Sequence, residues 1–292
     1  MDRTGTGKSG RRWRFGVDPR IDLLPRRRPA GQRRPGGIGA AARRMKNMDR
    51  AARRVARSAT VPTSRSSNLL WHNRMLRRYP GMPYRIDTID PSSTALLVID
   101  MQNDFLTPGA ALETPLGRAM IPRLNNVIAL CRDRGIPVIF TAHVHRADGT
   151  DMGIFAKLYP MIADRSALID GTPGVEIASS IAREPGDQLI KKHRYSAFYG
   201  TDLDLILRGR GIRTVVFTGV TVEDCVHATA RDAMFRNYDT VVLADVTATY
   251  DHADLGYGAM KAEEVHRASL VVLAQSTSSV LTAAEFEKAL PQ

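Results

Sequence analysis

The stretch TVVFTGVTVEDCVHATARDAMFRN, residues 214–237, joins an apolar run, a glycine-containing turn and an amphipathic segment that carries a cysteine near its start. The β-branched and aromatic run at 214–217 is typical of a strand buried on both faces. Residues 223–237 repeat apolar side chains at helical spacing. Cys225 would lie in the first helical turn, where free backbone N–H groups and the helix dipole favour a thiolate. The pattern indicates a nucleophile, and the alternative is a small buried cysteine.

Charge divides the chain into two parts. Residues 1–90 hold 23 basic and 6 acidic residues, a net charge of +17, and the remainder holds 19 basic and 24 acidic, a net of −5. Arginine runs among Pro, Gly and Ala predict a basic, disordered extension at 1–82, followed by one domain at 83–292. The extension is either a tether to an anionic surface or translated upstream sequence with the true start at Met75 or Met82. Nucleic acid is not an expected partner beyond non-specific contact by this extension.

The two cysteines are too few for a disulfide framework. Cys131 lies in a helical run at 121–134, so we expect it in the core. No stretch approaches the roughly 20 apolar residues of a membrane span, and no signal peptide is evident. These features predict a cytoplasmic protein without a membrane contact.

Apolar runs alternate with amphipathic segments along residues 83–292. This alternation predicts a parallel α/β sheet with right-handed crossovers and ligands bound past the carboxyl ends of the strands. A long loop at 143–174 is a candidate lid or binding segment. The expected strands are 94–100, 137–141, 187–191, 214–217, 240–244 and 270–273, and the expected helices are 121–134, 175–183, 202–208, 223–237, 253–268 and 282–290.

Three chemically active side chains fall at the ends of expected strands. Asp100 ends the first, Lys192 follows the third and Cys225 follows the fourth. Parallel strands end at the same edge of a sheet, so we expect the three to meet there. A lysine beside a cysteine lowers the thiol pKa, and an aspartate can take the thiol proton and pass it to a leaving amine. Singly each residue has an ordinary structural role, but together they favour catalysis.

The segments ALLVIDMQNDFL (95–106), KHRYSAFYGTDLD (192–204) and TGVTVEDCVHATARDA (218–233) resemble the isochorismatase-like cysteine hydrolases, which include nicotinamidases, N-carbamoylsarcosine amidases and ureidoacrylate amidases. The resemblance covers about residues 83–285. It implies a three-layer α/β/α fold of Rossmann type with a six-stranded, mostly parallel sheet. It also implies that Asp100, Lys192 and Cys225 form the catalytic triad.

The same resemblance implies a cis peptide bond between Val220 and Thr221. The backbone N–H groups of Thr221 and Cys225 would then hold the oxyanion. Other side chains near the triad are candidates for the substrate pocket, with core packing as the alternative. The pocket candidates are Phe105, His143, Tyr195 and Phe198, of which His143 is the polar contact.

Nicotinamidases resemble one another in an Asp-x-His metal motif after the second strand, and this chain departs from it. The corresponding stretch here is TAHVH at 141–145, with no aspartate two residues before either histidine: those places hold Thr141 and His143. A third ligand beside His143 and His145 is not evident, although Asp148 or Asp151 could serve. We therefore expect no metal and no cofactor, with both histidines lining the pocket.

The function expected from these features is a cysteine amidohydrolase that cleaves a C–N bond of a small amide, carbamoyl or ureido substrate through a thioester. The alternatives are a vinyl-ether hydrolase of the isochorismatase kind and a non-catalytic binding member. The carboxylates of Glu223 and Asp224 would weaken thiolate formation unless both point to solvent. Phe235 points away from the apolar face of its helix, which predicts a homodimer or homotetramer.

Overall fold

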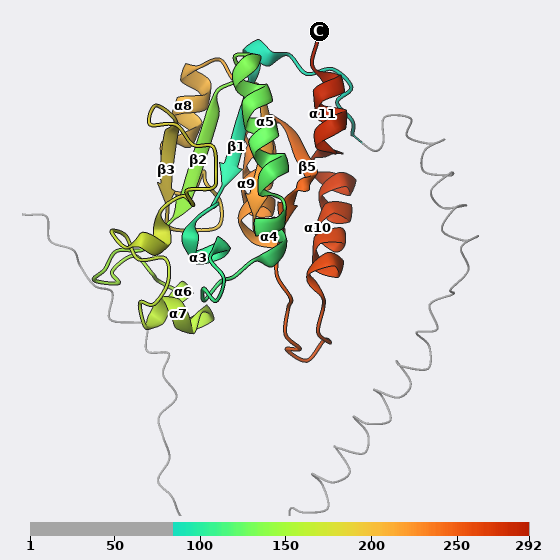
Figure 1. The fold of residues 1–292 in the computed structure, drawn as a ribbon. Coiled ribbons are helices and arrows are strands. Elements are labelled where there is room, and N and C mark those ends of the chain that lie inside the picture. The colour runs from blue at the N-terminus through green and yellow to red at the C-terminus, as the bar shows by residue number, and fades with distance from the viewer. Residues whose placement is uncertain (1–83, 292) are drawn as a thin grey trace, which may run out of the picture. The chain divides into compact units, whose positions relative to one another are not determined.

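The computed structural model describes residues 84–291, so the extension expected at 1–82 lies outside the described residues. Six parallel strands form one sheet in the order β3-β2-β1-β4-β5-β6, which confirms the predicted α/β fold (Figure 1). The first three strands extend the sheet from β1 to β3 on one side, and the last three extend it from β4 to β6 on the other side. The strands are β1 Thr94–Ile99, β2 Val138–His143, β3 Gln188–Lys192, β4 Thr214–Val220, β5 Asp239–Ala248 and β6 Ser279–Leu281.

Helices cover both faces of the sheet. Helices α4, α5 and α11 pack on one face, whereas α8, α9 and α10 pack on the other. Among the described residues, no helix is long and apolar enough to cross a bilayer. The helices are α3 Asn103–Leu106, α4 Pro115–Ala119, α5 Ile121–Asp133, α6 Phe155–Leu158, α7 Pro160–Ala163, α8 Leu203–Gly209, α9 His227–Phe235, α10 Ala262–Ser276 and α11 Ala283–Ala289.

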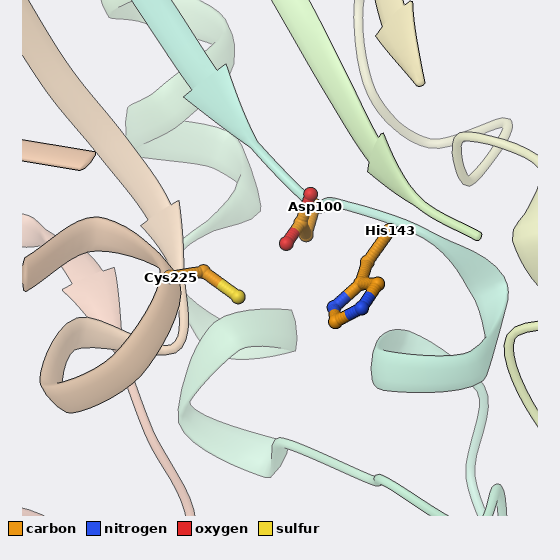
Figure 2. A group of neighbouring side chains, drawn as sticks. All are labelled: Asp100, His143 and Cys225. Atoms are coloured by element: carbon orange, nitrogen blue, oxygen red, sulfur yellow. The ribbon is translucent and has the colours of Figure 1, made fainter. Parts of the chain in front are cut away.

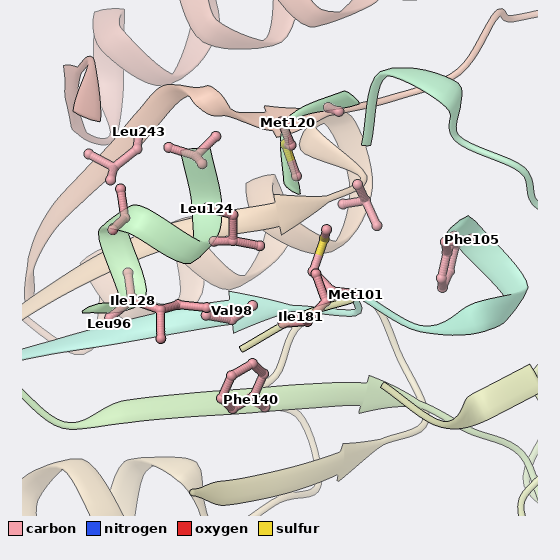
Figure 3. Packing of buried hydrophobic residues seen from close by; sticks show 14 of the residues in the cluster. Leu96, Val98, Met101, Phe105, Met120, Leu124, Ile128, Phe140, Ile181 and Leu243 are labelled. Atoms are coloured by element: carbon pink, nitrogen blue, oxygen red, sulfur yellow. The ribbon is translucent and has the colours of Figure 1, made fainter. Parts of the chain in front are cut away.

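The central strands β1, β2 and β4 are buried at every position because each of their faces is covered by helices. Along β1, Leu96 and Val98 pack beneath α5, and Leu97 and Ile99 pack against the opposite layer. Figure 3 shows the first of these cores, where Leu124 of α5 lies over the strands. Because helices cover both faces of the sheet, the register of the strands is fixed, and so are the positions of their carboxyl ends.

Gly219 allows β4 to approach β1 closely at the edge where ligands bind. Its φ is +103°, and a Cβ atom there would lie 2.0 Å from the carbonyl oxygen of Ile99. Ile99 and Gly219 are paired across the two strands. The turn that follows Gly219 therefore starts directly beside Asp100, the residue after β1.

Three expected elements are wrong. Residues 175–183 do not form a helix, because Ile177 pairs with Gln102 in an isolated bridge and Gln102 also donates to the carbonyl of Val175. The apolar run at 270–273 belongs to α10 rather than to a strand, and the sixth strand is β6 instead. A short apolar run is compatible with a strand or with a helix, and here the apolar residues continue the helical spacing of α10. The helix expected from residue 253 begins only at Ala262.

Candidate active site

The candidate site lies where the strand order reverses, at the carboxyl ends of β1 and β4 (Figure 2). Asp100 follows β1 with a positive φ of 50°, which an aspartate tolerates better than most residues. Lys192 is the last residue of β3 and pairs with His143 of β2. Cys225 lies in η3 (Val222–Val226), directly after β4. The structure thus brings Asp100, Lys192 and Cys225, called the triad below, to one place.

The triad is held together by the ammonium of Lys192. Its Nζ lies 2.7 Å from Asp100 Oδ2 and donates to Cys225 Sγ at 3.3 Å. It also donates to the carbonyl of Arg194 at 3.0 Å. The side chains of Lys192 and Asp100 are fully buried, so their opposite charges compensate each other within the protein interior.

Thr141 orients the carboxylate, a role that the sequence analysis missed. Its hydroxyl donates to Asp100 Oδ1 at 2.6 Å and accepts from the Asp100 N–H at 3.2 Å. Oδ2 contacts Lys192 as an ion pair without the geometry of a hydrogen bond. Oδ2 is therefore the oxygen that remains available to accept a proton. Thr141 was detectable in principle because it lies on the strand next to β1.

The electrostatics of the triad differ from the low thiol pKa expected from the sequence. Burial works to lower the pKa of Lys192, but the charges of Asp100 and Cys225 outweigh it and raise that pKa above its usual value. Burial raises the pKa of the Cys225 thiol well above its usual value; Lys192 opposes this, and Asp100 and Asp224 reinforce it. Burial thus favours the neutral thiol, against the opposing effect of the Lys192 ammonium.

The helix that carries Cys225 begins differently from the expected α-helix. Residues 222–226 form a π-helical turn closed by a hydrogen bond from Val226 N–H to the Thr221 carbonyl at 3.1 Å, and α9 follows. Cys225 remains within the first turn, as expected. The peptide bond between Val220 and Thr221 is cis. Both Thr221 and Cys225 line the pocket described next; their role as oxyanion donors stays a prediction.

A pocket with about 340 Å³ of space between atoms, part of it open to solvent, lies over Cys225. Three expected residues, Phe105, His143 and Tyr195, line it. Phe198 does not: it packs in the core of the opposite layer, near the ring of Tyr238. Several lining residues were not predicted from the sequence, because most of them lie in loops. The lining residues without a prediction are Leu112, Phe155, Tyr159, Ile162, Leu168, Asp224 and Tyr250.

A second group of ligand-type side chains, called the histidine cluster below, consists of His145, Asp151 and His193. One ligand atom from each lies within 4.8 Å of the others, and such nitrogen and oxygen donors suit zinc or iron. His193 Nδ1 already donates to the Val144 carbonyl at 2.7 Å, however, and the Arg146 N–H donates to Asp151. The sequence analysis considered Asp151 as a third ligand but missed His193, which the pairing of β2 with β3 brings near.

The chain is similar in sequence and fold to several known proteins. Residues 94–285 match the sequence model of the isochorismatase domain family. A protein of Arabidopsis thaliana named as a probable inactive nicotinamidase is 37% identical over 158 residues, 53% of this chain and 81% of that protein. A ureidoacrylate amidohydrolase of Methylobacterium radiotolerans is 33% identical over 229 residues, 72% and 84% of the two chains. A cysteine hydrolase structure from Pseudomonas syringae pv. phaseolicola has a TM-score of 0.66 at 33% identity, covering 69% of this chain and 93% of that one.

Proposed function

Since this chain belongs to the isochorismatase family of hydrolases, we propose that it is a cysteine amidohydrolase that cleaves the C–N bond of a small amide, carbamoyl or ureido compound. The observation that carries the proposal is the buried contact of Lys192 with both Asp100 and Cys225 beside a pocket. A nucleophile, a base and a fixed positive charge are the groups that acyl transfer requires.

In the first half of the proposed reaction, Asp100 Oδ2 accepts the proton of the Cys225 thiol as the sulfur attacks the carbonyl carbon. The high thiol pKa makes a free thiolate unfavourable, so proton transfer accompanies the attack. The backbone N–H groups of Thr221 and Cys225 stabilise the oxyanion, and the Lys192 ammonium offsets the added negative charge. The C–N bond breaks when Asp100 returns the proton to the leaving nitrogen, which departs as ammonia or an amine.

The second half of the reaction hydrolyses the thioester on Cys225. Asp100, now a carboxylate again, accepts a proton from the attacking water. The oxyanion is held by the same N–H groups, and collapse of the intermediate breaks the C–S bond. The carboxylic or carbamic acid leaves, and the proton on Asp100 returns to the sulfur, which restores the resting site.

The test is a screen of small amides and ureides for ammonia release, repeated with two cysteine variants. Cys225→Ala should reduce turnover by roughly a thousandfold or more, because no other group can form the thioester. Cys131→Ala is the matched control: Cys131 is buried in α5, away from the pocket lining, and turnover should be retained. More than a trace of ammonia release by Cys225→Ala would contradict the mechanism.

We also propose that the protein assembles at least as a dimer through the outer face of α9. Ala230 and Ala233 are fully buried beneath this helix, whereas the side chain of Phe235 is 66% exposed. Exposed large apolar side chains favour association, most often as two-fold dimers. Light scattering of the wild type and of Phe235→Asp tests this. A wild-type mass near the 32.2 kDa of one chain would contradict it.

A further inference from the structure

The pocket over Cys225 combines aromatic walls with one acidic side chain. The rings of Phe155, Tyr159, Tyr195 and Tyr250 line it, and Asp224 contributes a carboxylate. Within residues 84–291, no lysine or arginine belongs to this lining. The nearby cation of Lys192 is already engaged by Asp100. A substrate that enters therefore meets a carboxyl group among aromatic rings.

The carboxylate of Asp224 is poorly compensated by the protein itself. The hydroxyl of Tyr159 donates to its Oδ2 at 3.4 Å, which is long for an O–H donor. The adjacent Glu223 is also largely buried, and neither of its oxygens has a hydrogen-bond partner among the described residues. His252 Nε2 lies 3.6 Å from Glu223. Burial raises the pKa of the Asp224 carboxyl, and this is only partly opposed by the hydrogen bond from Tyr159 and by His252 and Lys192, which help to lower that pKa without forming an ion pair with Asp224. A positively charged group placed against Asp224 would stabilise its carboxylate form, so Asp224 is suited to a cationic partner.

The aromatic rings add to this preference for a cation, and His143 supplies a separate polar contact. The hydroxyls of Tyr159 and Tyr195 share a hydrogen bond of 2.7 Å beside Asp224. Rings around a cation attract it through their negative faces. His143 is almost fully buried, lines the pocket, and its Nε2 has no hydrogen-bond partner within the described residues. It offers a polar contact near Cys225, where the scissile group must lie (Figure 2).

We propose that Asp224 selects amide or ureido substrates that carry a positively charged amino group at the end remote from the scissile carbon, and disfavours those that carry a carboxylate there. The inference rests on the proposed function and specifies its substrate class. It separates this chain from the relatives named ureidoacrylate amidohydrolases, since an acrylate is an anion at neutral pH. A like charge placed against a partly buried carboxylate is unfavourable, and this repulsion is the basis of the discrimination.

Three amides of similar size but different charge test the inference: β-alaninamide, which is cationic, butyramide, which is neutral, and succinamate, which is anionic. Binding is measured by calorimetry with the full chain carrying Cys225→Ala, so that turnover does not interfere. We expect β-alaninamide to bind at least about tenfold more tightly than succinamate, with butyramide between them. Equal affinities, or tighter binding of succinamate, would overturn the inference.

A second substitution in the Cys225→Ala protein assigns the effect to its residue. Asp224→Asn keeps the size of the side chain and should reduce the affinity ratio to within about threefold. Glu223→Gln removes the same charge one residue away, outside the pocket lining, and should leave most of the ratio. An unchanged ratio in Asp224→Asn would overturn the inference.

Ammonia release from the same three amides by the wild-type protein separates the two proposals. Release that favours β-alaninamide supports both. A binding preference for β-alaninamide without release from any amide would contradict the amidohydrolase proposal and leave the charge selection supported. Release that favours succinamate would contradict the charge selection and support the amidohydrolase proposal.

Discussion

The triad and the histidine cluster both lie near the carboxyl ends of neighbouring strands, yet their buried polar atoms are satisfied very differently. Lys192 contacts both other members of the triad, and Thr141 holds one oxygen of Asp100. In the histidine cluster, Asp151 lies 3.0 Å from His193 Nδ1 and 3.5 Å from His145 Nδ1, contacts that are ion pairs only with a protonated histidine. Neither ring nitrogen of His145 has a hydrogen-bond partner among the described residues. The comparison indicates that the triad is preorganised by the chain itself, whereas the histidine cluster is not.

The largest effect is expected from breaking the triad at its centre. Lys192→Met leaves Asp100 buried without its counter-ion, so turnover should fall by roughly a thousandfold and stability by about 3–5 kcal/mol. Lys191→Met is the matched control, because Lys191 is exposed and pairs with Asp170 at the surface. Ammonia release and urea denaturation measure the two effects. Equal losses in both variants would show that the buried charge is not the cause.

A smaller effect is expected from removing the hydroxyl that orients Asp100. Thr141→Val deletes one hydrogen bond to the proposed base, which should lower kcat by about tenfold. The control is Thr240→Val, which deletes a buried hydrogen bond to the Thr277 carbonyl, and neither residue lines the pocket. That variant should lose similar stability without a change in kcat. An unaltered kcat in Thr141→Val would contradict the proposed role of Thr141 in orienting Asp100.

The resting protonation of Cys225 can be followed by alkylation with iodoacetamide. The thiol pKa is raised, so at neutral pH the folded protein holds mainly the unreactive thiol. The alkylation rate should therefore increase about tenfold per pH unit as the pH rises from neutrality toward that pKa. Cys131 is the internal control, because burial raises its pKa to about 12. A fast, pH-independent reaction of Cys225 would indicate a preformed thiolate instead.

The smallest effect is expected from the histidine cluster. Treatment with EDTA should leave turnover within about twofold, since the proton transfers proposed for the triad use only groups of the chain. His145→Ala tests the same point without a chelator and should leave the triad intact. Loss of activity on chelation, restored by zinc or iron, would give the histidine cluster the role of a metal site.

The sequence located the triad because its members occupy the ends of apolar runs, and parallel strands must end at one edge. The strands that precede Asp100 and Cys225 were predicted for the same reason. The role of Thr141 could not be predicted in this way, because it depends on the contact with Asp100 across the neighbouring strands β2 and β1. His193 was missed similarly: it follows β3, which pairs with β2, whereas the sequence separates it widely from His145.

Apolar periodicity by itself determined the layered α/β fold, since a buried strand and an amphipathic helix each have a distinctive spacing. Only the tertiary structure decided the lining of the pocket, because Tyr159 and Tyr250 come from loops whose path depends on distant contacts. It also decided the direction in which the pKa of the Cys225 thiol shifts. A helix N-terminus favours a thiolate, but burial between Asp100 and Asp224 outweighs that local effect, and burial is a property of the whole fold.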